Sequence, residues 1–170
     1  MLARVWSGSI VGIDALKVGV EIDVSGGLPG IVVVGLPDTA VQESRERVKA
    51  ALKNAGYAFP TRKIVINLTP ADLRKEGPSF DLPISVGILA ASEQVSARLL
   101  GDYIFLGEVS LDSQTIVKYI KTPTISRLVS ERPSSYRLLQ SLYRPSGLGN
   151  TRLRAAAGKI KSIWRNRNIH

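Results

Sequence analysis

The segment Asn67–Pro83, which reads NLTPADLRKEGPSFDLP, joins two apolar runs. The run before it, Lys63–Leu68, predicts a buried strand. The run after it, residues 82–91, favours a helix because it is about ten residues long and ends in two alanines. Thr69-Pro70 and Gly77-Pro78 mark the chain between the two runs as a loop. A polar loop that leaves a strand and delivers a Ser and an Asp to a helix start is a common place for binding or catalytic groups in α/β proteins.

The position of Pro83 decides where this helix is expected to begin. If Ser79 were the N-cap, Pro83 would be the fourth helical residue and would cost an intrahelical hydrogen bond. If Asp81 is the N-cap, Pro83 is the second helical residue, where no such bond is lost. The sequence therefore predicts Asp81 as the cap and leaves Ser79 in the loop before it.

Residues 1–35 predict β structure. Val18, Val20, Ile22 and Val24 alternate with small or acidic residues, which is the period of a half-buried strand. Ser7-Gly8-Ser9 is expected to form a turn between shorter strands. Residues 31–34 form a continuous apolar run, which is typical of a strand covered on both faces.

One helix and a further strand complete the pattern. Residues 37–56 predict an amphipathic helix with a capping box at Thr39 and Gln42, Asp38 at the positive end of the dipole and Gly56 as the closing residue. Residues 103–112 predict one strand, or two short ones divided at Gly107-Glu108. The predicted fold class is therefore α/β (α+β).

Charge divides the chain in two. The chain carries 23 Lys and Arg and 14 Asp and Glu, a net charge of +9. Residues 1–112 contain 11 basic and 13 acidic residues, whereas residues 113–170 contain 12 basic residues and Glu131 as their one acid. Prolines also interrupt the second part, and its apolar residues follow no sustained period. The sequence predicts a partial α/β domain over 1–112 and a basic, largely irregular tail over 113–170.

Composition excludes several classes of site. With no cysteine and a single histidine, His170, the chain offers no thiol nucleophile, no histidine-based triad and no metal cluster. No stretch approaches the roughly 20 apolar residues that a membrane-spanning helix needs. These features predict a cytoplasmic domain without a metal site and without a membrane partner.

Four segments of the first 112 residues resemble one protein family in their order and spacing: GLPDTAVQESRERV (35–48), NLTPADL (67–73), KEGPSFDLP (75–83) and LGEVSLD (106–112). They resemble the N-terminal domain of the ComM/YifB proteins, which are Mg-chelatase-like (ChlI-type) AAA+ ATPases. The resemblance implies a βα fold similar to the Lon protease domain and to domain two of a small-subunit ribosomal protein, here incomplete. It also implies a hexameric, ATP-driven parent protein, and ComM-like members that drive branch migration of DNA during transformation.

The ATPase motor of that family is not recognisable in the sequence. A Walker A loop needs G-x-x-x-x-G-K-[ST], but Gly158-Lys159 lacks the upstream glycine and is followed by Ile160. The chain is therefore expected to use no cofactor, with ATP and Mg confined to the family's ATPase module. Because the likeness stops after Asp112, the product is expected to be truncated or read in a shifted frame beyond that residue.

Ser79 raises the question of a peptidase. Gly77-Pro78-Ser79 matches the context of the nucleophile in Lon-type peptidases, and a serine nucleophile needs a base such as a lysine with a lowered pKa. The Lon lysine lies in a Gly-Gly-Leu-Lys context, which Lys118 and Lys121 lack. Phe80 also replaces the small residue that follows the nucleophile in Lon. Ser79 is therefore expected to be a structural residue of the loop and helix start.

Three functions remain as hypotheses. The first is a non-catalytic module of a ComM/YifB-type ATPase that contacts DNA or supports a homo-oligomer. The second is a Ser-Lys peptidase that uses Ser79, and the third is a nucleic-acid-binding fragment that acts through the basic tail. The residues of the loop motif are Asp72, Lys75, Glu76, Gly77, Pro78, Ser79 and Asp81. The cations expected to contact phosphates are Arg45, Arg47, Lys49, Arg62, Lys63, Arg74 and Lys75.

Overall fold

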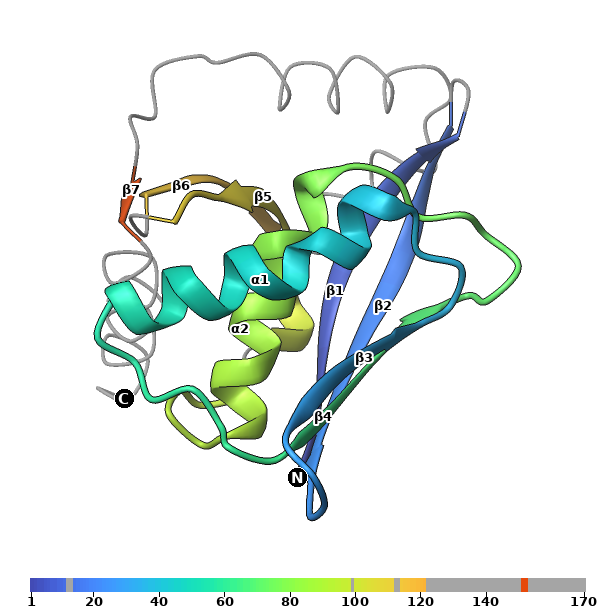
Figure 1. Cartoon of the computed structure of the whole chain (residues 1–170). Helices are drawn as coiled ribbons and strands as arrows, with labels where there is room; N and C mark the ends of the chain where they lie inside the picture. Colours follow the sequence, from blue (N-terminus) through green and yellow to red (C-terminus); the bar gives the residue numbers. More distant parts are fainter. Residues whose placement is uncertain (12–13, 99, 112–113, 122–150, 153–170) are drawn as a thin grey trace.

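The computed structural model describes residues 1–11, 14–98, 100–111, 114–121 and 151–152 (Figure 1). Its elements follow one another as β1 (Leu2–Val11), β2 (Asp14–Ser25), β3 (Gly30–Val34), α1 (Thr39–Asn54), β4 (Lys63–Thr69), η1 (Pro78–Phe80), α2 (Asp81–Ala91), η2 (Leu100–Asp102), β5 (Tyr103–Val109), β6 (Gln114–Lys121) and β7 (Thr151–Arg152). The predicted α/β class is confirmed. None of the helices in these ranges has the length and apolar character needed to cross a bilayer.

One mixed sheet holds all the described strands in the order β3-β4-β2-β1-β5-β6-β7. β1 and β2 form a long antiparallel hairpin, and β4 pairs antiparallel with β2. β3 runs parallel to β4, and β5 runs parallel to β1. The strands predicted within residues 1–35 and at Lys63–Leu68 are confirmed, but the turn predicted at Ser7-Gly8-Ser9 is wrong. These residues continue β1, because each of them pairs with a residue of β2.

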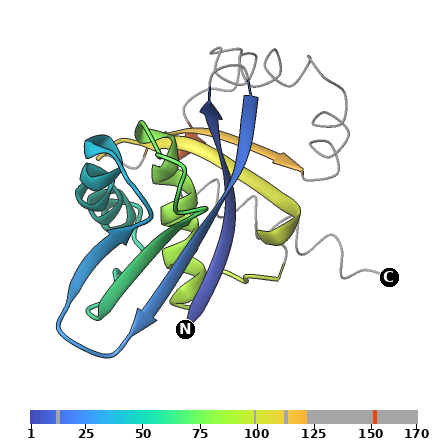
Figure 2. The same cartoon turned by 90° about the vertical axis from the view of Figure 1, so that its right-hand side faces the viewer.

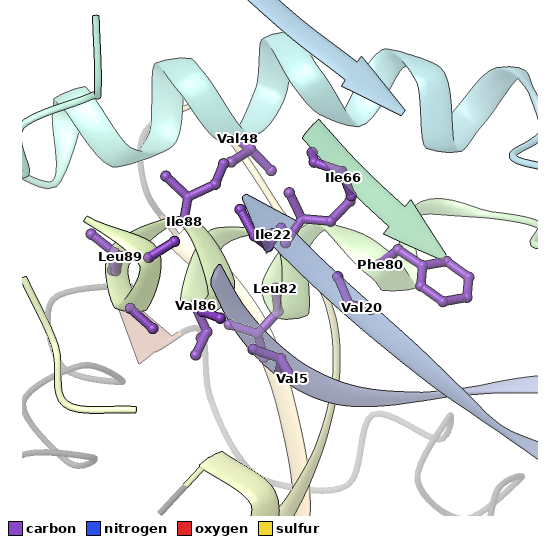
Figure 3. Close-up of a cluster of buried hydrophobic side chains, with 14 of the residues drawn as sticks. Val5, Val20, Ile22, Val48, Ile66, Phe80, Leu82, Val86, Ile88 and Leu89 are labelled. Carbon is purple, nitrogen blue, oxygen red and sulfur yellow. The ribbon is translucent and has the colours of Figure 1, made fainter. Parts of the chain in front are cut away.

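Both helices lie on the same side of the sheet, as Figures 1 and 2 show together. α2 contacts β1, β2 and β5, and α1 packs against α2. The alternating residues of β2 point toward these helices, so that Val18, Val20 and Ile22 are fully buried. Figure 3 shows how side chains from the strands and both helices meet in this core. The alternation predicted for residues 18–24 is therefore confirmed, since the apolar side chains of this strand lie on the face of the sheet that the helices cover.

The other face of the sheet carries a polar row across three strands. Arg4 of β1 forms an ion pair with Glu21 of β2, and Asn67 of β4 donates a hydrogen bond of 2.9 Å to the same carboxylate. The Asn67 amide and then the Arg4 guanidinium lower the pKa of Glu21, while partial burial opposes them. Val32 and Val34 of β3 are 45% and 42% exposed, so the prediction that this strand is covered on both faces is wrong.

α2 is buried on every side, since all residues from Asp81 to Ala91 are buried. The helix approaches the β1–β2 hairpin closely at Gly87, where an added Cβ would lie 2.6 Å from Ile22 Cγ1 and 3.5 Å from Val5 Cγ2. A helix that is apolar all round is typical of a core position. The helix predicted for residues 82–91 is confirmed.

The start of α1 differs from the predicted capping box. The N-cap is Asp38, whose carboxylate accepts a hydrogen bond of 2.7 Å from the Val41 amide, and Thr39 is the first helical residue. A side-chain acceptor at the N-cap satisfies one of the free amides at the helix start, and aspartate does this as well as serine or threonine. Gly56 has a positive φ of 81 directly after the C-cap Ala55, as predicted.

The sheet does not end at the change in composition after Asp112. Residues 103–109 form the single strand β5, without a division at Gly107, and β6 pairs antiparallel with it along its whole length. The prediction that irregular chain begins directly after Asp112 therefore needs correction for residues 114–121. Only Thr151 and Arg152 of the remaining tail lie among the described residues, as β7.

Candidate functional site

The loop from Thr69 to Phe80 is fixed to the start of α1 by backbone hydrogen bonds. Lys75 donates from its amide to the Leu36 carbonyl (3.1 Å), and its own carbonyl accepts from the Asp38 amide (3.0 Å). Asp38 also uses its second carboxylate oxygen to accept from the Gly77 amide at 3.0 Å. Gly77 has a φ of 82, a conformation that favours glycine. Asp38 thus caps α1 and holds the Gly-Pro-Ser turn at the same time.

Lys75 is fully buried beneath this loop. Its ammonium group donates to the Pro70 carbonyl, and removal of the charge from water lowers the pKa of the amine, with partial compensation from Asp72. A buried ammonium with a carbonyl partner cannot reach the phosphates of a nucleic acid. The prediction that Lys75 contacts phosphates is therefore wrong, because the side chain is buried and its ammonium group binds a carbonyl of the same loop.

Asp81 lies at the centre of a buried polar cluster. Its carboxylate accepts from Nε and Nη2 of Arg47 (2.8 and 3.1 Å), from the Ser44 hydroxyl and from the Val109 amide (3.3 Å). These donors come from α1 and β5, while Asp81 is the first residue of α2. Asp81 is thus not the N-cap, which is Phe80 without a side-chain hydrogen bond, because the carboxylate points toward α1 and β5. The short helical turn η1 continues directly into α2 and leaves no separate cap.

The Arg47 side chain belongs to the same polar cluster. The bidentate contact with Asp81, supplemented by charge attraction from Asp81, Glu108 and Glu43, raises the pKa of Arg47, and its Nη2 also donates to the Ala40 carbonyl at 3.0 Å. The Asp81 carboxylate thus binds the Nε–Nη2 edge of the guanidinium, and Nη1 lies 3.7 Å from the exposed Glu43 carboxylate. Arg47 therefore joins α1 to α2 through Asp81, and a contact of Arg47 with nucleic acid stays a prediction.

Ser79 occupies η1, one residue before the N-cap of α2, and is half-buried. Within the described ranges its hydroxyl forms no hydrogen bond. The nearest lysine in the sequence, Lys75, donates its ammonium to Pro70. Lys118 and Lys121 are in β6, in register with Leu106 and Tyr103. Among the described contacts, none joins Ser79 to a base, and its interpretation as a structural residue stays a prediction.

The remaining predicted cations lie in two places. Lys63 is exposed at the start of β4, and Arg74 is exposed in the loop, where it forms a 3.2 Å ion pair with Glu76. Arg45, Lys49 and Arg62 instead line a pocket of about 440 Å³ between α1 and the opposite loop. The other residues that line it are Pro29, Gly30, Ile31, Glu46, Lys53, Phe59, Pro60 and Thr61.

The cations predicted to contact phosphates did not include Lys53, and the prediction did not include the opposite wall of this pocket. Arg45, Lys49 and Lys53 follow one another at intervals of four residues, so they form one row along α1. That spacing was available in the sequence as a signal. The opposite wall, residues 59–62, carries no motif, and only the fold brings it to α1. Among the described residues, no group of three His, Cys, Asp or Glu side chains could hold a metal ion.

Comparison with known proteins places these features in a family. The family described as "Subunit ChlI of Mg-chelatase" matches residues 20–128, which is more than half of the chain. This chain belongs to the ChlI family. The ChlI match runs past Asp112 and includes the whole of β6, in agreement with the pairing of that strand.

Relatives within the ChlI family are similar to the first two thirds of the chain. The protein YifB of Salmonella typhimurium is 51% identical over 110 residues, and YifB of Escherichia coli is 49% identical over 110 residues. The competence protein ComM of Haemophilus influenzae is 47% identical over 113 residues. These alignments cover 65–66% of this chain and 22% of each relative, so the chain spans about a fifth of the length of the relatives that it matches.

Proposed function

We propose that this chain acts as the non-catalytic N-terminal module of a ComM/YifB-type DNA-processing ATPase, and that it contacts DNA through the cations of α1 and of the loop before β4. The single observation that supports the DNA contact is the convergence of Arg45, Lys49, Lys53 and Arg62 on one pocket. The relative ComM is a competence protein by name, and it supplies the context of DNA processing.

The cations proposed to contact DNA are concentrated at one place on the described part of the chain. Residues 1–112 are slightly acidic as a whole, so non-specific attraction by net charge does not favour DNA binding by this part. A local group of lysine and arginine side chains can still position a phosphate backbone. The DNA contact therefore belongs to the surface that carries these cations and not to the whole domain.

In this role the chain binds DNA and carries out no chemical step itself. No Walker A sequence occurs in the 170 residues, and ATP hydrolysis is proposed to belong to the ATPase module of the longer relatives. Assembly into a homo-oligomer with such modules is part of the same proposal. Among the residues that the structure describes, Ser79 contacts no base, so this part of the chain gives no support to a peptidase.

The test separates the folded body from the basic tail. In the full chain, the ten Lys and Arg residues that follow β6 are replaced by Gln: Arg127, Arg132, Arg137, Arg144, Arg152, Arg154, Lys159, Lys161, Arg165 and Arg167. The binding of labelled single-stranded and duplex DNA to this protein is measured by fluorescence anisotropy across a salt series. The proposal expects DNA binding to persist in this tail-neutralised protein with a reduced salt dependence. If binding disappears, the tail carries it and the proposed function is wrong.

A further inference from the structure

We infer that the pocket between α1 and residues 59–62 binds a nucleotide of a single-stranded nucleic acid, with phosphates on the cationic row and the base against Phe59. This inference rests on the proposed function, because it names the form of nucleic acid that the module contacts. Its starting point is the shape of the site. A volume of about 440 Å³ lies within the roughly 300–1,000 Å³ that is usual for pockets that enclose a small molecule.

The pocket carries a net positive charge. Four cationic side chains line it against the single acid Glu46, and none of these four forms an ion pair with any described residue. Arg45, Lys49 and Lys53 stand at successive turns of α1, and Arg62 faces them from the opposite wall. Neighbouring cations at such spacing repel one another unless an anion joins them. An extended polyanion would satisfy the whole row.

Arg45 is held at the edge of the pocket by the protein itself. Its Nε donates to the Gln42 carbonyl at 2.8 Å, and its Nη1 reaches the Ile31 carbonyl of β3 at 3.5 Å. These contacts join α1 to the edge of the sheet and fix the guanidinium without use of a carboxylate. The positive charge therefore stays available to a ligand, in contrast to that of Arg47, which Asp81 neutralises.

The opposite wall gives the site its second chemical property. Phe59 packs against the hydrophobic core and also lines the pocket, together with Pro60, Pro29 and Ile31. An inorganic phosphate would make no use of an aromatic and apolar wall. Proteins that bind single-stranded nucleic acids combine a basic groove with aromatic side chains on which bases stack. The bases of a duplex are paired and stacked inside the helix, so only an unpaired strand can place a base in a pocket of this kind.

The experiment uses the tail-neutralised full chain defined above, so that the body alone is measured. Two variants test the pocket. Lys49→Gln/Lys53→Gln/Arg62→Gln removes three of its cations, and Phe59→Leu removes the aromatic face but keeps an apolar side chain for the core. Arg74→Gln/Arg98→Gln/Lys17→Gln removes three exposed cations outside the pocket and serves as the matched control. Unchanged circular dichroism and thermal unfolding qualify each variant for comparison.

Binding of an oligothymidylate, a duplex of the same length and a mononucleotide is measured at several salt concentrations. We expect the wild-type pocket to prefer the single strand. The pocket triple variant should reduce the slope of log K against log[salt] by about 2, since each phosphate contact to a single strand contributes roughly 0.7. Phe59→Leu should weaken single-strand binding about tenfold at every salt concentration, because the loss of base stacking does not depend on counterions.

Several results would overturn the inference. An equal effect of the control triple variant would show that DNA binding depends on the overall positive charge and not on the cations of the pocket. An unchanged affinity in Phe59→Leu, or equal affinity for the duplex, would show that phosphates are bound on the surface and no base enters the pocket. In the two cases that concern Phe59 and the duplex, the cations of the pocket still contact DNA and the proposed function survives, whereas an equal effect of the control triple variant would also remove its support for a contact at α1. Loss of all DNA binding in the tail-neutralised protein would instead reject both.

Discussion

Asp81→Ala should destabilise the protein more than any other exchange of an acidic residue in the described chain. The Asp81 carboxylate is fully buried and accepts from Arg47, Ser44 and Val109, which belong to two other elements. Removal of one partner from a buried ion pair costs about 3–5 kcal/mol. Because the Arg47 side chain remains 23% exposed and can recover some hydration, we expect the lower end, about 3 kcal/mol.

Urea unfolding followed by circular dichroism measures this loss. With an m value of about 1–3 kcal/mol/M, a loss of about 3 kcal/mol moves the midpoint by about 1–3 M at unchanged m. Glu43→Ala is the matched control, since Glu43 is 65% exposed and lies 3.7 Å from the same guanidinium. It should cost no more than about 0.5 kcal/mol. A double-mutant cycle with Arg47→Ala should give a coupling of about 1–3 kcal/mol.

The reasoning would be refuted by either of two results. If Asp81→Ala costs less than about 1 kcal/mol, the cluster does not join α1, α2 and β5 in the way that the hydrogen bonds indicate. If the coupling between Arg47 and Asp81 is close to zero, the loss comes from the helix start and not from the ion pair.

Four further measurements test other parts of the structure. Burial lowers the folded-state pKa of Lys75, so the unfolded chain binds more protons between that pKa and the ordinary 10.5. Lys75→Met should therefore be at least as stable as wild type at pH 7 and lose this advantage as the pH rises toward 10.5; a difference that does not change with pH would contradict this. Gly87→Ala should lower the free energy of unfolding by about 1–2 kcal/mol despite the better helix propensity of alanine, because the new Cβ meets Ile22 at 2.6 Å; a stabilised variant would show that α2 can move away from the sheet. Asp38→Ala should cost about 1–2 kcal/mol, since it removes both the cap and the acceptor of the Gly77 amide, whereas Asp38→Asn should keep most of the cap; equal losses in the two variants would contradict the capping role. A fluorophosphonate probe should leave Ser79 unlabelled, and labelling that is lost in Ser79→Ala would revive the peptidase hypothesis.

The sequence by itself determined the class of fold and the family. Period-2 alternation in β2, the apolar runs around the central loop and the amphipathic α1 are local patterns, and local backbone geometry alone fixes how they repeat. For the same reason Gly56 could be recognised as a helix stop. The four motif segments likewise lie in continuous chain, so the resemblance to the ChlI family could be read from the residues and was then confirmed.

Only the tertiary structure decided which polar residues are buried in the interior and which line the pocket. Arg45 and Arg47 are two positions apart in one helix, yet one lines the pocket and the other pairs with Asp81, which lies 34 residues further along the chain. The sequence predicted that Lys75 contacts phosphates, but in the fold its side chain is buried and donates to the Pro70 carbonyl. The pocket itself needs α1, the start of β3 and residues 59–62 together. Such contacts depend on how distant segments pack, and the spacing of residues within any one segment carries no record of that packing.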